Sequence, residues 1–172
     1  SLFRTLSQHV LSPAKIVTEM NNSISDNNES NMFVTLIVGI LDLETGILKL
    51  CNAGHNPPIL IYPDGQVSYL EFKTQIFVGV VEDFKYSDEE VVLEKESKLF
   101  LYTDGVTEAE NINKELYGEE KLLEMLSDNA SSDVRTTVNV VVDSIASHVK
   151  EAEASDDLTI LLIQYEPGTA NS

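Results

Sequence analysis

The sequence has 172 residues and a hydrophobic fraction of 42%, and none of its apolar runs reaches the roughly 18 residues of a membrane-spanning segment. Asp and Glu number 29 against 11 Lys and Arg, and the resulting net charge of -18 repels nucleic acid and anionic lipid. We expect one soluble domain with a solvated acidic surface, and a dedicated acidic docking face is the alternative. The single cysteine, Cys51, excludes an internal disulfide and, with no signal peptide visible, favours the cytoplasm.

The amino-terminal part of the chain predicts two successive helices. Residues 1–11 carry apolar side chains at roughly helical spacing, yet no cap precedes them, so we expect the chain to begin inside a helix. Ser12 and Pro13 then form a helix-start pair. The apolar face of this second helix consists of Ile16, Val17, Met20 and Ile24.

A series of β-rich runs follows a polar loop at residues 25–31, and we interpret these runs as an antiparallel meander. The predicted strands are 32–41, 47–53, 59–62, 67–72, 90–94 and 98–102, with turns at 42–46 and 63–65. Gly46 is expected to adopt the positive φ of a hairpin turn.

After residue 105 the spacing of apolar residues becomes typical of helices. One short helix is predicted at 119–126, and valine and isoleucine residues between Val134 and Val149 recur with a period close to 3.6. Residues 158–165 then predict a fully buried closing strand. Antiparallel strands with helices before and after them indicate an α+β layered domain.

Acidic side chains stand at the ends of two apolar strands. Asp104 follows the strand 98–102, and Asp156 and Asp157 directly precede the strand 158–165. Carboxylates fixed at strand ends can hold a hard cation such as Mg²⁺, Mn²⁺ or Ca²⁺, and Gly105 would let the backbone turn sharply beside Asp104. If the two strands are neighbours, the acids meet at one rim of the sheet. The alternative is that these residues form only a turn and a connection.

Other reactive side chains give weaker signals. His55 lies in the turn cluster AGHNPP, where it either braces the loop by a hydrogen bond or takes part in chemistry. The sequence contains no G-x-S-x-G nucleophile motif and no phosphate-binding glycine loop. Cys51 lies inside a predicted strand and is expected to be a buried apolar residue.

Three motifs together carry a family resemblance. The stretches MFVTLIVGILDLETGILKLCNAGHNPPIL, LFLYTDGVTEAEN followed by ELYGEEKLLEML, and ASDDLTILLI occur in this order and span nearly the whole chain. Together they resemble the SpoIIE and RsbU group of bacterial serine/threonine phosphatases, in the metal-dependent protein phosphatase 2C superfamily. The resemblance implies an α-β-β-α sandwich of two antiparallel sheets flanked by helices, with a site for two Mn²⁺ or Mg²⁺ ions.

The resemblance also implies roles for individual residues. Asp104 in TDG and Asp156 in the D-[DN]-x-T motif match metal ligands of the family. Asp157 takes a position often held by asparagine and is given a supporting role, and Glu108 is a weaker candidate near an additional metal position. The implied reaction is hydrolysis of phosphoserine or phosphothreonine by metal-activated water on a small partner, such as a phosphorylated anti-sigma-factor antagonist. The face formed by Ile16, Val17 and Met20 is implied as a regulatory switch for an upstream sensor domain, with packing alone as the alternative.

The family's G-D-x-x-D and D-x-S-G-x-G segments are not present in this sequence. We therefore expect residues 1–166 to be an amino-terminally truncated phosphatase domain that lacks its first strands, followed by a tail at 167–172. Without the bridging acids it would hold one cation weakly or none, so little activity is expected. Uncovered sheet edges would favour a homodimer.

Two other classes of function stay open at this point. A degenerate phosphatase module could bind a partner or transmit a signal without hydrolysing anything. A structural domain that binds Ca²⁺ or Mg²⁺ is the third possibility.

Overall fold

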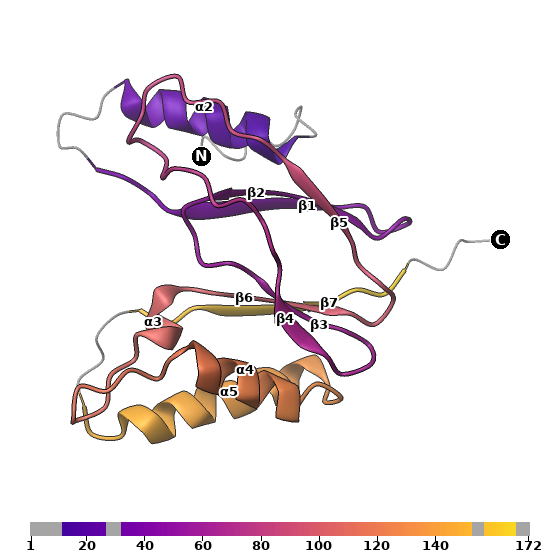
Figure 1. Ribbon diagram of the computed structural model, residues 1–172, viewed down its shortest axis with the longest axis vertical. Helices are drawn as coiled ribbons and strands as arrows, with labels where there is room; N and C mark the ends of the chain where they lie inside the picture. Colours follow the sequence, from indigo (N-terminus) through magenta and orange to yellow (C-terminus); the bar gives the residue numbers. More distant parts are fainter. Residues whose placement is uncertain (1–11, 27–31, 153–156, 168–172) are drawn as a thin grey trace. The chain divides into compact units, whose positions relative to one another are not determined.

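The computed structural model describes residues 12–26, 32–152 and 157–167, which form two compact units. The first unit contains the described residues within Ser1–His55, Glu71–Leu93 and Pro167–Ser172. The second contains those within Asn56–Leu70 and Glu94–Glu166. Each unit has its own antiparallel sheet and its own apolar core, so each is described in turn (Figure 1).

The sheet of the first unit has the strand order β1-β2-β5. Its strands are β1 (Leu36–Leu41), β2 (Ile47–Ala53) and β5 (Glu89–Val92). The predicted hairpin between β1 and β2 is confirmed, because the Asp42 carboxylate accepts the amides of Glu44 and Thr45 and Gly46 has a φ of 74°. Cys51 faces the core of this unit, where burial raises the pKa of its thiol to about 12.

Helix α2 (Pro13–Ser25) lies along one face of this sheet (Figure 1). Its start is as predicted: the Ser12 hydroxyl oxygen accepts the amide of Lys15, and Pro13 occupies the first turn. Ile16 and Val17 are fully buried and Met20 is half-buried. This apolar face therefore packs against the strands.

The sheet of the second unit has the order β4-β3-β6-β7. Its strands are β3 (Ile59–Ile61), β4 (Val67–Tyr69), β6 (Lys98–Tyr102) and β7 (Ile160–Gln164). Each neighbouring pair is antiparallel, and the β6 and β7 register runs from Lys98 opposite Gln164 to Tyr102 opposite Ile160.

Two longer helices, α4 (Glu119–Asp128) and α5 (Val134–Val149), cover one face of this sheet (Figure 1). The valine spacing predicted α5 correctly, and the Asp133 carboxylate caps its first turn by accepting the Thr136 amide. A four-residue helix, α3 (Asp104–Thr107), separates β6 from the segment that leads to α4. The buried core between helices and sheet includes Ile59, Phe100, Val106, Leu122, Leu126 and Val141.

Three expectations about the strands need correction. The first run forms a strand only from Leu36, because Met32 and Phe33 are exposed and Val34 makes just an isolated bridge to Val78. The strands do not form one meander, since β5 pairs with β2 and β6 pairs with β3 in separate sheets. The closing strand β7 is not fully buried either: it lies at a sheet edge, and Leu161 is 53% exposed.

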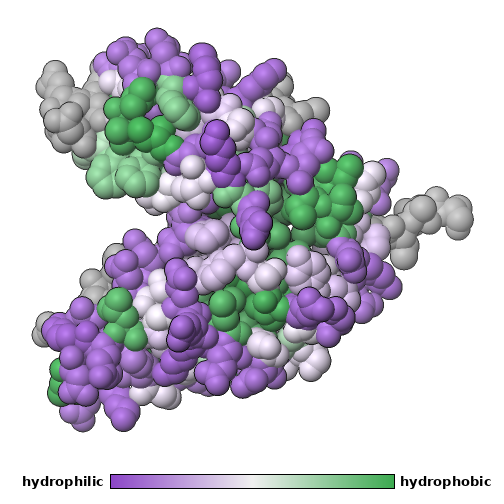
Figure 2. Space-filling view, viewed as in Figure 1, coloured by the Kyte–Doolittle hydropathy of each residue, from purple (hydrophilic) through white to green (hydrophobic). Residues whose placement is uncertain are grey.

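The visible surface is mostly hydrophilic, with apolar side chains gathered in separate patches (Figure 2). This agrees with the net charge of -18. Among the described helices, none has the length and apolar character that crossing a bilayer demands.

Candidate metal site

The ends of two neighbouring strands form the candidate site. β6 and β7 pair antiparallel, so the carboxyl end of β6 lies beside the amino end of β7. The ladder extends one step further, because the Thr103 amide donates to the carbonyl oxygen of Thr159 at 3.1 Å. The condition set by the sequence is therefore met: the segments that carry Asp104 and Asp157 share one rim of the second unit's sheet.

Asp104 is the first residue of the short helix α3, whereas the sequence predicted a sharp backbone turn beside it at the end of the strand. The Asp104 carboxylate accepts the amide of Gly105 at 3.0 Å, and its main-chain carbonyl accepts the Glu108 amide at 2.8 Å. The Thr107 hydroxyl also donates to this carbonyl, at 3.3 Å. These bonds fix the backbone of Asp104 while its side chain stays exposed to solvent.

Gly105 is required here for space. A Cβ atom added at this residue would lie 2.5 Å from the main-chain carbonyl oxygen of Asp157, which is closer than real Cβ contacts allow. Any larger residue would push the Asp157 segment away from Asp104. The glycine thus lets the two acidic segments approach. The sequence had instead predicted that Gly105 allows a sharp turn of the backbone.

The other predicted site residues have different outcomes. Asp156 lies outside the described residues. Glu108 ends α3 as its exposed C-cap residue, one turn after Asp104. His55 belongs to the first unit, where its main-chain N–H and C=O both bond to the Asn52 side chain, at 2.8 and 2.9 Å. These two bonds brace the loop through the main chain of His55, and the role of its side chain stays a prediction.

The chemistry of the donor set fits a hard divalent cation. Asp104 and Asp157 offer carboxylate oxygens at a rigid rim, and Gly105 keeps the rim free of a side chain that would separate them. Within residues 12–26, 32–152 and 157–167, however, no three side chains of His, Cys, Asp or Glu are grouped as a complete metal site would need. Among the described residues, Asp104 and Asp157 are therefore candidate ligands and do not by themselves make a complete site.

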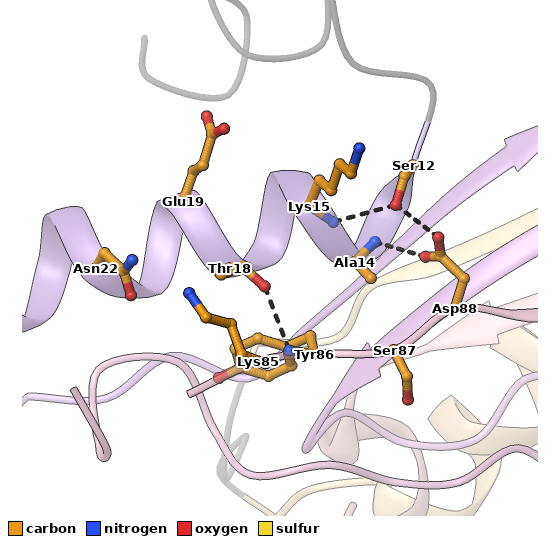
Figure 3. A pocket seen from close by; sticks show the side chains of 10 residues that line it. All are labelled: Ser12, Ala14, Lys15, Thr18, Glu19, Asn22, Lys85, Tyr86, Ser87 and Asp88. Atoms are coloured by element: carbon orange, nitrogen blue, oxygen red, sulfur yellow. Dashed lines mark hydrogen bonds between the residues drawn. The ribbon is translucent and has the colours of Figure 1, made fainter. Parts of the chain in front are cut away.

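A polar pocket of about 520 Å³ borders α2 in the first unit (Figure 3). The Asp88 carboxylate accepts the Ser12 hydroxyl at 2.6 Å and the amide of Ala14, and the Thr18 hydroxyl oxygen accepts the Tyr86 amide at 3.3 Å. The segment 79–88 therefore holds the polar side of α2, whereas the predicted regulatory face of Ile16, Val17 and Met20 packs into the core.

The family of the chain follows from the match of its sequence to a protein-family model. The model described as Stage II sporulation protein E (SpoIIE) matches residues 1–166. The chain belongs to the SpoIIE family. This membership confirms the resemblance on which the sequence interpretation relied.

Individual SpoIIE-type proteins show the same likeness. Phosphoserine phosphatase RsbU of Bacillus subtilis (strain 168) is 24% identical over 153 residues, a match that covers 88% of this chain and 45% of RsbU. The SiaA-PP2C domain of Pseudomonas aeruginosa has a TM-score of 0.80 at 21% identity, over 96% of this chain and 68% of that one. The manganese-presoaked phosphatase domain of SpoIIE from Bacillus subtilis has a TM-score of 0.66 at 15% identity, over 98% and 73%.

These comparisons establish the family and the fold. The predicted class of antiparallel sheets with flanking helices is confirmed. The chain spans less than half the length of the curated relatives that it matches, between 24% and 45%.

Proposed function

We propose that this SpoIIE-family chain is part of a metal-dependent protein serine/threonine phosphatase domain. The observation that carries the proposal is the close approach of the Asp104 and Asp157 segments at the rim of β6 and β7, for which Gly105 leaves the space. Asp104 and Asp156 are the proposed ligands of Mn²⁺ or Mg²⁺, with Asp157 and Glu108 in supporting roles. The name of the RsbU relative as a phosphoserine phosphatase supports the substrate chemistry.

The residues of the rim would hold and orient the reacting groups without forming a covalent intermediate. A divalent cation bound there would lower the pKa of a coordinated water and neutralise charge on the phosphoryl oxygens. Asp104 would supply a carboxylate oxygen from a backbone that α3 fixes. Gly105 would keep the facing segment within reach. The exposed position of Asp104 leaves room for a phosphorylated side chain of a partner protein.

The proposed substrate is a small phosphorylated regulatory protein of the anti-sigma-factor-antagonist type. An upstream sensor or regulatory domain in the same protein would control the reaction, and the greater length of the curated relatives supports the existence of such further segments in the family.

We also propose that these 172 residues alone have little or no turnover. The described acids form no group of three, and two dications at roughly 3.5 to 4 Å from each other need bridging carboxylates to offset their repulsion. The second candidate function is a non-catalytic module that binds a partner or transmits a signal.

The test compares Asp104→Asn with Asp128→Asn, an equal charge change at the exposed end of α4. Binding of Mn²⁺ to each purified chain is followed by paramagnetic broadening of amide NMR signals. We expect Asp104→Asn to weaken binding by more than about tenfold, since even residues that only support ligands change affinity that much. Asp128→Asn should bind as the wild type does.

Activity is measured in the same samples as phosphate release from a phosphoserine protein with and without Mn²⁺. Turnover by the wild-type chain at the rate of an intact phosphatase domain would contradict the proposed low activity. Equal Mn²⁺ affinity for the wild type and Asp104→Asn would remove Asp104 from the site and the metal-dependent function with it.

A further inference from the structure

We propose that Thr103 is a positioning residue that fixes the acidic segment around Asp157 against Asp104. The proposal rests on the metal site of the proposed function. It concerns a residue for which the sequence patterns predict no role of its own.

The Thr103 side chain forms hydrogen bonds to two residues, Asp157 and Thr159, in the segment that leads into β7. Its hydroxyl donates to the carbonyl oxygen of Asp157 at 3.2 Å and accepts the amide of Thr159 at 3.1 Å. Its main-chain amide meanwhile donates to the carbonyl oxygen of Thr159. A hydroxyl group has one proton and two acceptor positions, so both kinds of bonding capacity are in use.

These bonds occur at the last step of the ladder between β6 and β7, where the Thr159 amide bonds to a side chain instead of the main chain. The last registered pair of β6 and β7 is Tyr102 with Ile160. Beyond this pair the Thr103 hydroxyl oxygen accepts a hydrogen bond from the Thr159 amide, and the same hydroxyl donates one to the carbonyl oxygen of Asp157. The side chain of Thr103 therefore continues the ladder into the acidic segment.

An attractive contact is needed at this position because the acids do not attract one another. Carboxylates of like charge repel where they come close, and Gly105 only removes a steric obstacle to the approach of the Asp157 main chain. The Thr103 hydroxyl supplies the bonds that hold the Asp157 backbone in place. The expected consequence is that cation affinity depends on Thr103, although its hydroxyl need not touch the cation.

Three substitutions separate this role from a merely structural one. Thr103→Val keeps the branched shape and removes the hydroxyl, whereas Thr103→Ser keeps the hydroxyl. Thr159→Val is the matched control, since it removes a hydroxyl from the same rim while leaving the Thr159 amide bond in place.

The first measurement is amide hydrogen exchange of the metal-free chain. Thr103→Val should accelerate exchange at Thr159, whose amide loses its acceptor, and Thr103→Ser should restore protection. The second is the Mn²⁺ affinity from paramagnetic broadening. We expect Thr103→Val to weaken it about tenfold, the usual effect of losing a group that orients a ligand, with Thr103→Ser and Thr159→Val close to the wild type.

The outcomes distinguish this inference from the function on which it rests. If Asp104→Asn weakens Mn²⁺ binding and Thr103→Val does not, Thr103 is no positioning residue, even if exchange at Thr159 accelerates. If Asp104→Asn has no effect on binding, the proposed metal site itself is wrong, and the positioning role falls with it.

Discussion

Lys98 is a buried cation in a chain with few basic residues. It is the first residue of β6 and only 6% exposed, and burial lowers the pKa of its ammonium group. The ammonium donates to the carbonyl oxygen of Ala130 at 2.7 Å and to that of Ser132. These carbonyls lie in the turn between α4 and α5, so one side chain ties this turn to the sheet.

We expect Lys98→Met to lower the free energy of unfolding by about 2 kcal/mol, because two carbonyl groups lose a charged donor. Urea denaturation at neutral pH measures the change. Lys95→Met is the control: Lys95 is exposed, and its effect should stay within about 0.5 kcal/mol. An unchanged stability of Lys98→Met would mean that desolvation of the ammonium offsets both hydrogen bonds.

Single residues of the candidate site could be predicted only in part. Asp104 and Gly105 are candidates from the sequence because they stand where an apolar strand ends, and the ligand role of Asp104 stays a prediction. Thr103 was missed because its hydroxyl bonds to a segment more than fifty residues away, and only the register of β6 and β7 brings the two together. The position of Gly105 was found, but the steric reason for it depends on the same long-range register.

At the scale of elements, helix α2 has two faces with different contacts. Its apolar face packs into the core, and its polar face forms hydrogen bonds to the segment 79–88. Asn21 is fully buried, and its side chain accepts the Gly79 amide and donates to the Val81 carbonyl, both at 2.9 Å. Together with the bonds of Thr18 and Asp88, this holds α2 to the segment 79–88 along three turns. A movement of α2 would therefore have to carry that segment along or break these bonds.

Val17→Ala should lower the free energy of unfolding by about 2 kcal/mol, since it removes two methyl groups from a fully buried side chain. The exposed Glu19→Ala on the same helix serves as the control. In a longer protein that carries the proposed sensor domain, a regulatory face predicts that Val17→Ala also changes how activity responds to the signal. Loss of stability with an unaltered response would leave packing as the only role of this face.

Elements with a strong local pattern were predicted best. The valine period gave α5, and the turn residues gave the hairpin of β1 and β2. The four-residue helix α3 is too short to show a period, and the exposure of β7 depends on its place at a sheet edge. Burial of a strand is decided by its neighbours, and its own residues gave no sign of the edge position.

At the scale of the whole molecule, the apolar residues form two separate cores. One contains Ile16, Val17 and Val38, and the other contains Phe100 and Leu122. The sequence suggested a continuous meander because most successive β-runs are separated by short turns. The exchange of partners, in which β5 returns to β2 and β6 returns to β3, involves strands about forty residues apart and has no local signature.

Leu122→Ala should destabilise the second unit by about 3 kcal/mol, because it opens a cavity in a fully buried position. Amide exchange mapped by mass spectrometry is expected to accelerate in β3, β6, α4 and α5 and to stay unchanged in β1 and β2. Val38→Ala in the first core should give the reverse pattern. Equal acceleration in both units would show that they unfold as one cooperative body.

The homodimer suggested by the sequence stays a prediction. The structure adds one surface on which it can be examined, the edge strand β7 with its exposed Leu161 and Ile163.

The rim between β6 and β7 has a thermodynamic consequence for ligand binding. Its backbone is held by hydrogen bonds within the protein itself, so the entropy of arranging Asp104 and Asp157 should belong to folding and not to binding. A cation that enters such a site should bury little apolar surface and should bind with a heat-capacity change near zero. A site assembled by folding around the metal would instead give a large negative value.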